Sequence, residues 1–180
     1  MTDKLLHNHS VPASACLEAL RRCGVDHLVT VPDWVQLALH AKLEAGEAPD
    51  IALINTSNEN QAVTLAAGLT LGGKRPVLLM QNQGLYNCVN TVRAVCIDAR
   101  IPTVMLVGQF GREYENLGQP ATASRRSMVR LMEPMLDALG IPFYTLDSAA
   151  DLVFIDKAFE QATADGGAVV ILVSAPLAWS

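Results

Sequence analysis

The chain has 180 residues, of which 51% are hydrophobic and 17% charged, and its formal net charge is −5. This length suits one domain with a single core, and the low charge suits a buried sheet with extensive subunit contacts. We therefore expect one domain spanning 1–180, with a core at about 12–175, and self-association. No basic run exceeds the pair Arg125 and Arg126, so the acidic chain lacks the electrostatic footprint of a nucleic-acid-binding protein.

The start of the chain lacks the apolar core of a signal peptide. No apolar run approaches the roughly 20 residues that span a bilayer. We therefore expect a cytoplasmic protein without membrane contact. The histidines are scattered and the cysteines form no CxxC pair, so no metal site is expected within this chain.

Helical periodicity alternates with short aliphatic runs along the chain. The sequence predicts strands at 27–31, 51–54, 76–80, 103–107 and 168–173, a weaker strand at 142–146, and helices at 12–23, 33–46, 59–73, 85–99, 126–139 and 149–164. The strands are apolar on both faces, which is typical of a parallel sheet covered by helices on each side. The predicted fold is therefore α/β, a three-layer α/β/α arrangement with a mainly parallel sheet of about six strands.

Ligands of open parallel sheets bind beyond the carboxyl ends of the strands. In this chain the loops at that edge read PDW, NTSNEN, QNQGLYN and GQFGREYENLGQPATASRR. The fourth loop is long for a compact domain and mixes glycines, amides and charged side chains. It is either a lid or partner contact, or an irregular loop exposed to solvent.

Glu59 is the only acid between Asp50 and Asp98, and it follows the second predicted strand. Its spacing from Thr56 fits a capping box, in which the carboxylate bonds back to the start of its own helix. Alternatively, a lone carboxylate in a desolvated site has a raised pKa and shares a proton with a ligand nitrogen. The spacing alone leaves both roles open.

Amide side chains cluster where the third predicted strand meets the next helix, at Gln81, Asn82, Gln83, Asn87 and Asn90. Such residues cap and turn a chain, and they also serve ligand or subunit contacts. Gly84 among them lets a flat ligand or another subunit approach the backbone closely. No GxxxxGK[ST] loop and no GxSxG elbow occurs, so neither a common nucleotide site nor a serine hydrolase is indicated.

The run NENQAVTLAAGLTLGGKRPVLLMQNQGLYNCVNTV, with VPDW before it and LDALGIPFYTL after it, resembles the pyrimidine-binding domain of thiamine diphosphate enzymes. Within that family it is similar to the alpha subunits of sulfopyruvate decarboxylases and to the N-terminal half of phosphonopyruvate decarboxylases. The order of the glutamate, AVTLAAG and QNQGLYN makes this combination more specific than a lone acid.

The resemblance implies that Glu59 is the cofactor-activating glutamate. Its hydrogen bond to the pyrimidine N1′ favours the imino tautomer, whose nitrogen removes the proton from thiazolium C2. The implied ylide then attacks the carbonyl of a 2-oxo acid, and the thiazolium ring accepts the electrons left as carbon dioxide departs. The residues implied to bind the cofactor with Glu59 are Asn82, Gln83, Gly84, Leu85 and Asn87.

This family holds Mg²⁺ and the diphosphate through a GDG motif followed by an Asn, and no GDG occurs in this sequence. The resemblance therefore implies half of a split enzyme, an alpha-type subunit that is active only with a beta-type subunit carrying that motif. Thiamine diphosphate and Mg²⁺ are the implied cofactors, with the ligands of the metal and diphosphate supplied mainly by the partner subunit.

The implied reaction is the non-oxidative loss of carbon dioxide from a small 2-oxo acid to give an aldehyde, with sulfopyruvate or phosphonopyruvate as the substrate. A sulfonate or phosphonate needs an anion site made by cations or by a helix N-terminus. Arg112, Arg125 and Arg126 are the candidates, against the alternative that they are solvated surface residues. Asp33 and Gln81 are further candidates for substrate contact, and Asp33 is equally placed to cap the next helix.

Two residues depart from the QNSGLGN that matching decarboxylases tend to carry: Gln83 replaces a serine and Tyr86 replaces a glycine. Both changes alter the bulk and the hydrogen bonding beside the implied site. Two alternatives to a decarboxylase stay open. One is carboligation or other 2-oxo acid chemistry with the same cofactor, and the other is a noncatalytic binding module that kept the fold.

Overall fold

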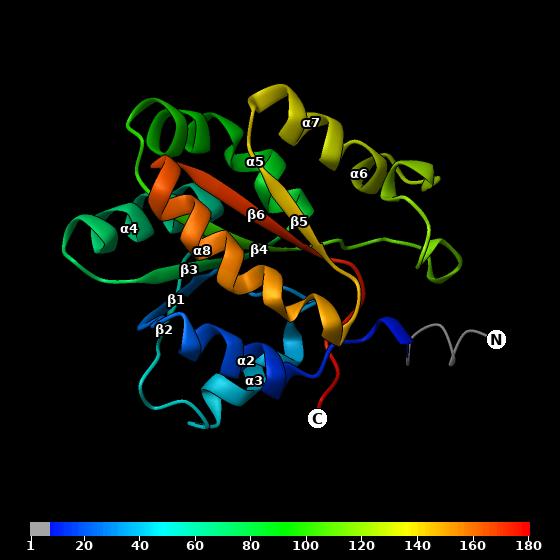
Figure 1. Cartoon of the computed structure of the whole chain (residues 1–180), viewed down its shortest axis with the longest axis horizontal. Helices are drawn as coiled ribbons and strands as arrows, with labels where there is room; N and C mark the ends of the chain where they lie inside the picture. The colour runs from blue at the N-terminus through cyan, green and yellow to red at the C-terminus, as the bar shows by residue number, and fades with distance from the viewer. Residues whose placement is uncertain (1–7) are drawn as a thin grey trace.

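The computed structural model describes residues 8–180, which form a single sheet flanked by helices (Figure 1). All six strands are parallel, in the order β2-β1-β3-β4-β6-β5. The strands are β1 (His27–Thr30), β2 (Ala52–Asn55), β3 (Pro76–Gln81), β4 (Thr103–Gly108), β5 (Phe143–Leu146) and β6 (Ala168–Val173). The predicted parallel α/β sheet, including its weak strand near residue 143, is confirmed.

Helices cover both faces of the sheet. One face carries α2 (Ala13–Arg22), α3 (Leu37–Glu44) and α8 (Val153–Asp165), and the other carries α4 (Glu59–Leu71), α5 (Asn82–Val92) and α7 (Met132–Leu139). Each face of the sheet packs against its helices in a separate hydrophobic core. Successive side chains of a strand point alternately into the first and the second core, as the period of a β-strand requires. In β4, for example, Val104 packs toward the first core and Met105 toward the second. The predicted three layers are therefore present.

Strand β2 departs from the prediction that every strand is buried on both faces. Its residues are only partly buried or exposed. The reason is topological, because β2 lies at the edge of the sheet and pairs with β1 alone. An aliphatic run read from the sequence does not distinguish an edge strand from a central one.

The predicted helix 126–139 is broken into α6 (Ser127–Arg130) and α7. Pro134 explains the break, since within one continuous helix its ring meets the carbonyl of Arg130 and its nitrogen donates no hydrogen bond. Restarting the helix at Met132 places Pro134 in the first turn, where no such bond is needed. The predicted helix 85–99 also changes character, because it continues from α5 as a π-helix over Arg93–Asp98.

The remaining helical turns are short. Tyr114–Asn116 and Ala121–Ala123 lie in the long segment after β4, and Ala149–Leu152 leads into α8. The last of these begins with a capping box made by Ser148 and Asp151. Across residues 8–180, no helix combines the length and the apolar character needed to cross a membrane.

Substitution by alanine is expected to have opposite effects on stability at two glycines, Gly140 and Gly68. Gly140 follows α7 with φ +66°, and no atom lies within 4 Å of a Cβ built on it. Gly140→Ala is therefore expected to lower the free energy of unfolding by roughly 1–2 kcal/mol through backbone strain alone. Gly68 lies inside α4, also with open space around a Cβ. Gly68→Ala is expected to raise that free energy by about 0.5–1 kcal/mol.

Urea unfolding of the purified chain and of the two variants measures both changes. A Gly140→Ala protein as stable as the unsubstituted chain would show that the turn after α7 does not need its left-handed backbone.

Candidate active site

Glu59 is the first residue of α4, and its carboxylate does not cap that helix. The cap is Asn58, whose side chain accepts a hydrogen bond from the Gln61 amide at 3.0 Å. The Thr56 hydroxyl instead donates to the main-chain carbonyl of Thr30 at 3.1 Å. The predicted capping box is therefore wrong, because α4 starts too late for Glu59 to occupy the third position.

The Glu59 carboxylate rests against the second helix of the same layer. Asn87 Nδ2 donates to Glu59 Oε2 at 3.1 Å. A Cβ placed on Gly84 lies only 2.5 Å from Glu59 Oε1, so the carboxylate occupies the space that a side chain at this position needs. Within residues 8–180, no cation forms an ion pair with Glu59. A neutral amide therefore holds the carboxylate in place against a glycine, and no cation of these residues neutralises its negative charge.

Asn82, at the start of α5, is fully buried. Its Nδ2 donates to the carbonyls of Phe110 and Met128 at 3.0 and 3.1 Å, and its Oδ1 accepts from the amide of Gln83. Both ends of the side chain are thus bonded to protein. Asn82 organises the loops around the site, and a role in contacting the cofactor receives no support from its geometry.

The other amide-run residues predicted at the site differ in exposure. Gln83 is exposed, and its Nε2 lies 3.8 Å from the sulfur of Met128. Leu85 is 1% exposed and belongs to the core beneath α5. Gln81 ends β3 with a buried amide oxygen that has no partner among the described residues. Of these three, Gln83 alone is open to a ligand.

Asp33 is 1% exposed and makes a turn before α3. Its Oδ1 accepts from the amide of Val35 at 2.8 Å and its Oδ2 from Gln36 Nε2 at 2.7 Å. The predicted helix starting at residue 33 begins instead at Leu37, and its cap is Gln36 without a side-chain bond, so the capping role is wrong. Burial raises the pKa of Asp33, although these two hydrogen bonds act in the opposite direction.

The turn containing Asp33 depends on Gly108 at the end of β4. A Cβ on Gly108 lies 2.1 Å from Asp33 Oδ2 and 2.7 Å from Val35 Cβ. Any side chain at position 108 therefore expels the Asp33 carboxylate. The structure brings Asp33 to the carboxyl edge of the sheet, but beneath its surface.

Arg112 is a structural cation of the long segment 109–131. Its side chain is 2% exposed, and every N–H of the guanidinium is directed at a protein acceptor. The acceptors are the side chains of Gln109, Asn116 and Ser174 and the carbonyls of Asn116 and Gln119. No donor is left for a substrate anion.

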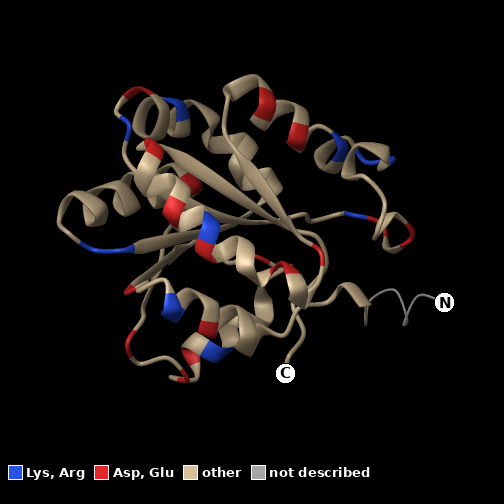
Figure 2. Ribbon diagram, in the orientation of Figure 1, with Lys and Arg blue, Asp and Glu red and all other residues tan. Residues whose placement is uncertain are grey.

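Glu113, the next residue, joins the early and the late parts of the same segment. Its carboxylate accepts from the Ser124 hydroxyl at 2.6 Å and from the Arg125 amide at 3.0 Å. The hydrogen bond from Ser124 holds the pKa of Glu113 below its usual range. The segment is therefore braced by its own charges, which Figure 2 shows as neighbouring basic and acidic stretches.

A pocket of about 370 Å³ opens beside this segment at the carboxyl edge of the sheet. Its walls come from Trp34 and Val35 on the turn after β1, from residues 109–115, from Arg125 and Arg126, and from Ser174 and Pro176. Arg126 lies across Gly111, with Nη1 3.3 Å from the position of a glycine Cβ. The candidate cations thus gather at one pocket, separate from the contacts that hold Glu59.

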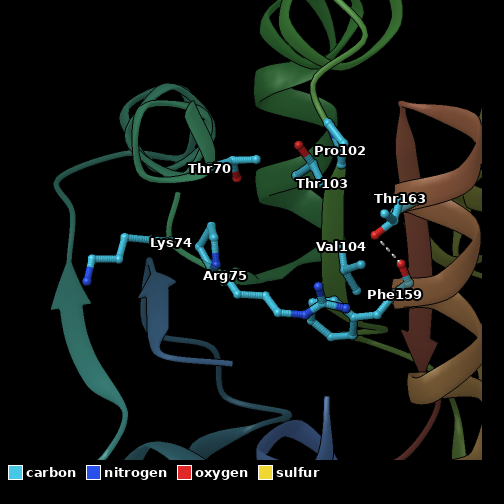
Figure 3. A pocket seen from close by; sticks show the side chains of 10 residues that line it. Thr70, Lys74, Arg75, Pro102, Thr103, Val104, Phe159 and Thr163 are labelled. Carbon is cyan, nitrogen blue, oxygen red and sulfur yellow. Dashed lines mark hydrogen bonds between the residues drawn. The ribbon is translucent and has the colours of Figure 1, made fainter. Parts of the chain in front are cut away.

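A second pocket, of about 200 Å³, lies at the opposite, amino edge of the sheet (Figure 3). The hydroxyls of Thr70, Thr103 and Thr163 on its walls already donate to main-chain carbonyls. The guanidinium of Arg75 lies over the ring of Phe159, 5.1 Å from its centroid. The remaining polar side chains of its lining are the cations Lys74 and Arg75, and no carboxylate, histidine or cysteine lines the pocket to act as an acid, a base or a nucleophile.

The fold belongs to a class seen in thiamine diphosphate enzymes. A solved structure of thiamine diphosphate-dependent 4-hydroxybenzoylformate decarboxylase from Rhodococcus jostii RHA1 superposes with a TM-score of 0.66 at 18% identity. The match covers 92% of this chain and 30% of that chain, so this chain spans less than a third of the neighbour. At this identity the likeness establishes the fold alone.

Residues 13–140 match the family described as thiamine pyrophosphate enzyme, N-terminal TPP binding domain, and the chain belongs to this family. Sulfopyruvate decarboxylase subunit alpha of Methanocaldococcus jannaschii is 31% identical over 130 residues, covering 72% of this chain and 73% of its own. The protein of the same name from Methanothermobacter thermautotrophicus is 31% identical over 140 residues, covering 77% and 80%. These matches confirm the expected family, the thiamine diphosphate cofactor and the decarboxylase class.

Proposed function

We propose that this chain is the alpha-type subunit of a thiamine diphosphate-dependent decarboxylase acting on a 2-oxo acid with a second anionic group, such as sulfopyruvate or phosphonopyruvate. The observation that carries the proposal is the state of Glu59 in a chain of this family. Its carboxylate caps no helix, pairs with no cation in residues 8–180, and is held against Gly84 by Asn87.

The residues present fit the pyrimidine end of the cofactor. When bound, thiamine diphosphate supplies the carbon nucleophile and the electron sink for loss of carbon dioxide from a 2-oxo acid. Glu59 shares a proton with a ring nitrogen in this proposal, while Asn87 keeps its Oε2 oriented and Gly84 leaves room for the carboxylate. Because no arginine or lysine among residues 8–180 pairs with Glu59, its charge is available to that nitrogen. The proposed contacts are thus Glu59, Gly84, Asn87 and the exposed Gln83.

The metal and the diphosphate belong to a second subunit in this proposal. Support comes from the sequence, which lacks the GDG motif, and from the relatives, whose names describe an alpha subunit. We therefore propose a cytoplasmic hetero-oligomer in which a beta-type subunit supplies the GDG motif and Mg²⁺.

Arg126 is the best candidate to bind the second anionic group of the substrate. Arg112 has no donor left, and Arg125 lies 3.7 Å from the Glu113 carboxylate with 85% of its side chain exposed. Across residues 8–180, no carboxylate pairs with Arg126, whose guanidinium lies over Gly111 on the pocket wall. A guanidinium suits the oxygens of a sulfonate or phosphonate.

Arg126→Ala is expected to raise KM for sulfopyruvate or phosphonopyruvate by roughly 10-fold to 100-fold, the usual worth of a charge-assisted hydrogen bond. The KM for pyruvate, which lacks the second anion, is expected to stay within about twofold. Arg125→Ala is the matched control and is expected to change neither. Equal effects of the two substitutions on all three substrates would contradict the assignment of Arg126.

The function itself is tested by co-expressing the chain with the GDG-bearing subunit of its host and adding thiamine diphosphate and Mg²⁺. Carbon dioxide release and the aldehyde product are followed for each 2-oxo acid, with and without an added aldehyde acceptor. A product formed only with the acceptor would identify carboligation instead. A complex that binds the cofactor but transforms no 2-oxo acid would contradict an enzymatic role.

A further inference from the structure

The first turns of α5 contact two different parts of the molecule. Gly84 and Asn87 lie against Glu59, as described above. Gln83 and Tyr86 contact Met128 of α6. Residues three apart on a helix share a face, so Gly84 and Asn87 lie on one face of α5 and Gln83 and Tyr86 lie on another. One short stretch of helix therefore touches both the proposed cofactor-activating acid and the end of segment 109–131.

Met128 is the point at which that segment is fastened. Its main-chain carbonyl accepts hydrogen bonds from Tyr86 Oη at 3.2 Å and from Asn82 Nδ2 at 3.1 Å. The same Asn82 amide donates to the carbonyl of Phe110 at the start of the segment. Asn82 thus joins the two ends of the segment, whereas Tyr86 holds its far end to α5.

The fastening point lies next to the cation of the pocket. Met128 Sδ lies 3.0 Å, and Arg126 Nη1 3.3 Å, from the same position, that of a Cβ on Gly111. Met128 and Arg126 are also separated by a single residue of the chain. A shift of the Met128 carbonyl is therefore expected to displace Arg126 as well, because Gly111 has no side chain that would hold Arg126 in place.

We infer that Tyr86 is a positioning residue, which acts through the carbonyl of Met128 to hold Arg126 at a fixed place relative to Glu59. Tyr86 touches neither Glu59 nor the pocket wall in any hydrogen bond of the described residues. Burial raises the pKa of its phenol, so the hydroxyl remains a donor at neutral pH. The inference about substrate binding rests on the proposed function, while the fastening of the segment does not.

The test compares Tyr86→Phe with Tyr144→Phe in the assembled complex. Each substitution removes one hydroxyl and keeps the ring, and the Tyr144 hydroxyl bonds Gln161 at 2.8 Å, between β5 and α8. Hydrogen–deuterium exchange is measured for peptides covering 110–131. Loss of one hydrogen bond is expected to speed exchange there by roughly 3-fold to 10-fold in Tyr86→Phe, with no change in Tyr144→Phe. Unchanged exchange in Tyr86→Phe would overturn the inference.

Kinetics separate positioning from a general loss of structure. Tyr86→Phe is expected to raise KM for the anionic 2-oxo acid by roughly 3-fold to 10-fold, with kcat within about twofold and with unchanged affinity for thiamine diphosphate. The effect on KM is expected to vanish in an Arg126→Ala background. Faster exchange with unchanged KM would overturn the link to Arg126. A complex inactive on every 2-oxo acid would count against the proposed function alone, and the exchange data would then decide the fastening by Tyr86.

Discussion

Glu59→Gln is expected to lower kcat for 2-oxo acid decarboxylation by about 10²-fold to 10⁴-fold, the range typical of a positioned acid or base. Glutamine keeps the volume of the side chain and still offers an oxygen to Asn87, so the contact at 3.1 Å can persist. What the substitution removes is the negative charge and the site that holds a proton. The measurement is the rate of carbon dioxide release by the reconstituted complex at saturating substrate.

Glu160→Gln on the exposed face of α8 is the matched control, because it makes the same chemical change far from the proposed site. Circular dichroism and the yield of complex are compared for both variants. Near-normal turnover by a folded Glu59→Gln complex would sink the assignment of Glu59 as the cofactor-activating acid.

Gly84→Ala is expected to lower kcat by about 10²-fold although it adds a single methyl group. The new Cβ would lie 2.5 Å from Glu59 Oε1 and 2.6 Å from its Cγ, so the carboxylate must move. Glu59 is a flexible side chain near the surface, so the fold accommodates this movement while the geometry toward the cofactor is lost. Gly68→Ala, on the neighbouring helix α4, is the control for adding a methyl group without a collision.

The two substitutions are expected to act on the same group. Added to Glu59→Gln, the alanine at position 84 should therefore lower kcat by little more, since the carboxylate it displaces is already absent. Binding of thiamine diphosphate, followed by fluorescence or calorimetry, provides a readout besides turnover. Fully multiplicative effects of the two changes would show that Gly84 serves some purpose other than making room for Glu59.

The sheet was predictable because its signal is local and repeated. Each aliphatic run coincides with a strand to within a residue or so, and the helices between them force parallel connections. Residues at helix starts were harder to assign from spacing. Thr56 and Glu59 have capping-box spacing but do not form one, whereas Ser148 and Asp151 do. Whether a capping box forms depends on the residue at which the helix begins after the preceding strand, and the spacing of two residues does not determine that position.

The site was predictable only in part. Of the six cofactor-binding residues that the resemblance implied, the structure brings Gly84 and Asn87 against Glu59. The resemblance also pointed to Arg112, but every N–H of its guanidinium is hydrogen-bonded within the protein. Nothing in the sequence indicated the role of Met128, because it acts through a main-chain carbonyl, a group that every residue has. Contacts made by backbone atoms across long loops carry no residue-type signal.

The strand order has a consequence for how the chain is made. β6 is the last strand in sequence, yet it lies between β4 and β5, and within residues 8–180 it is the only strand that pairs with β5. During synthesis, β4 and β5 therefore wait with open edges until residues 168–173 have left the ribosome. Open strand edges invite pairing with other chains. Nascent chains cut short before β6 are thus expected to aggregate.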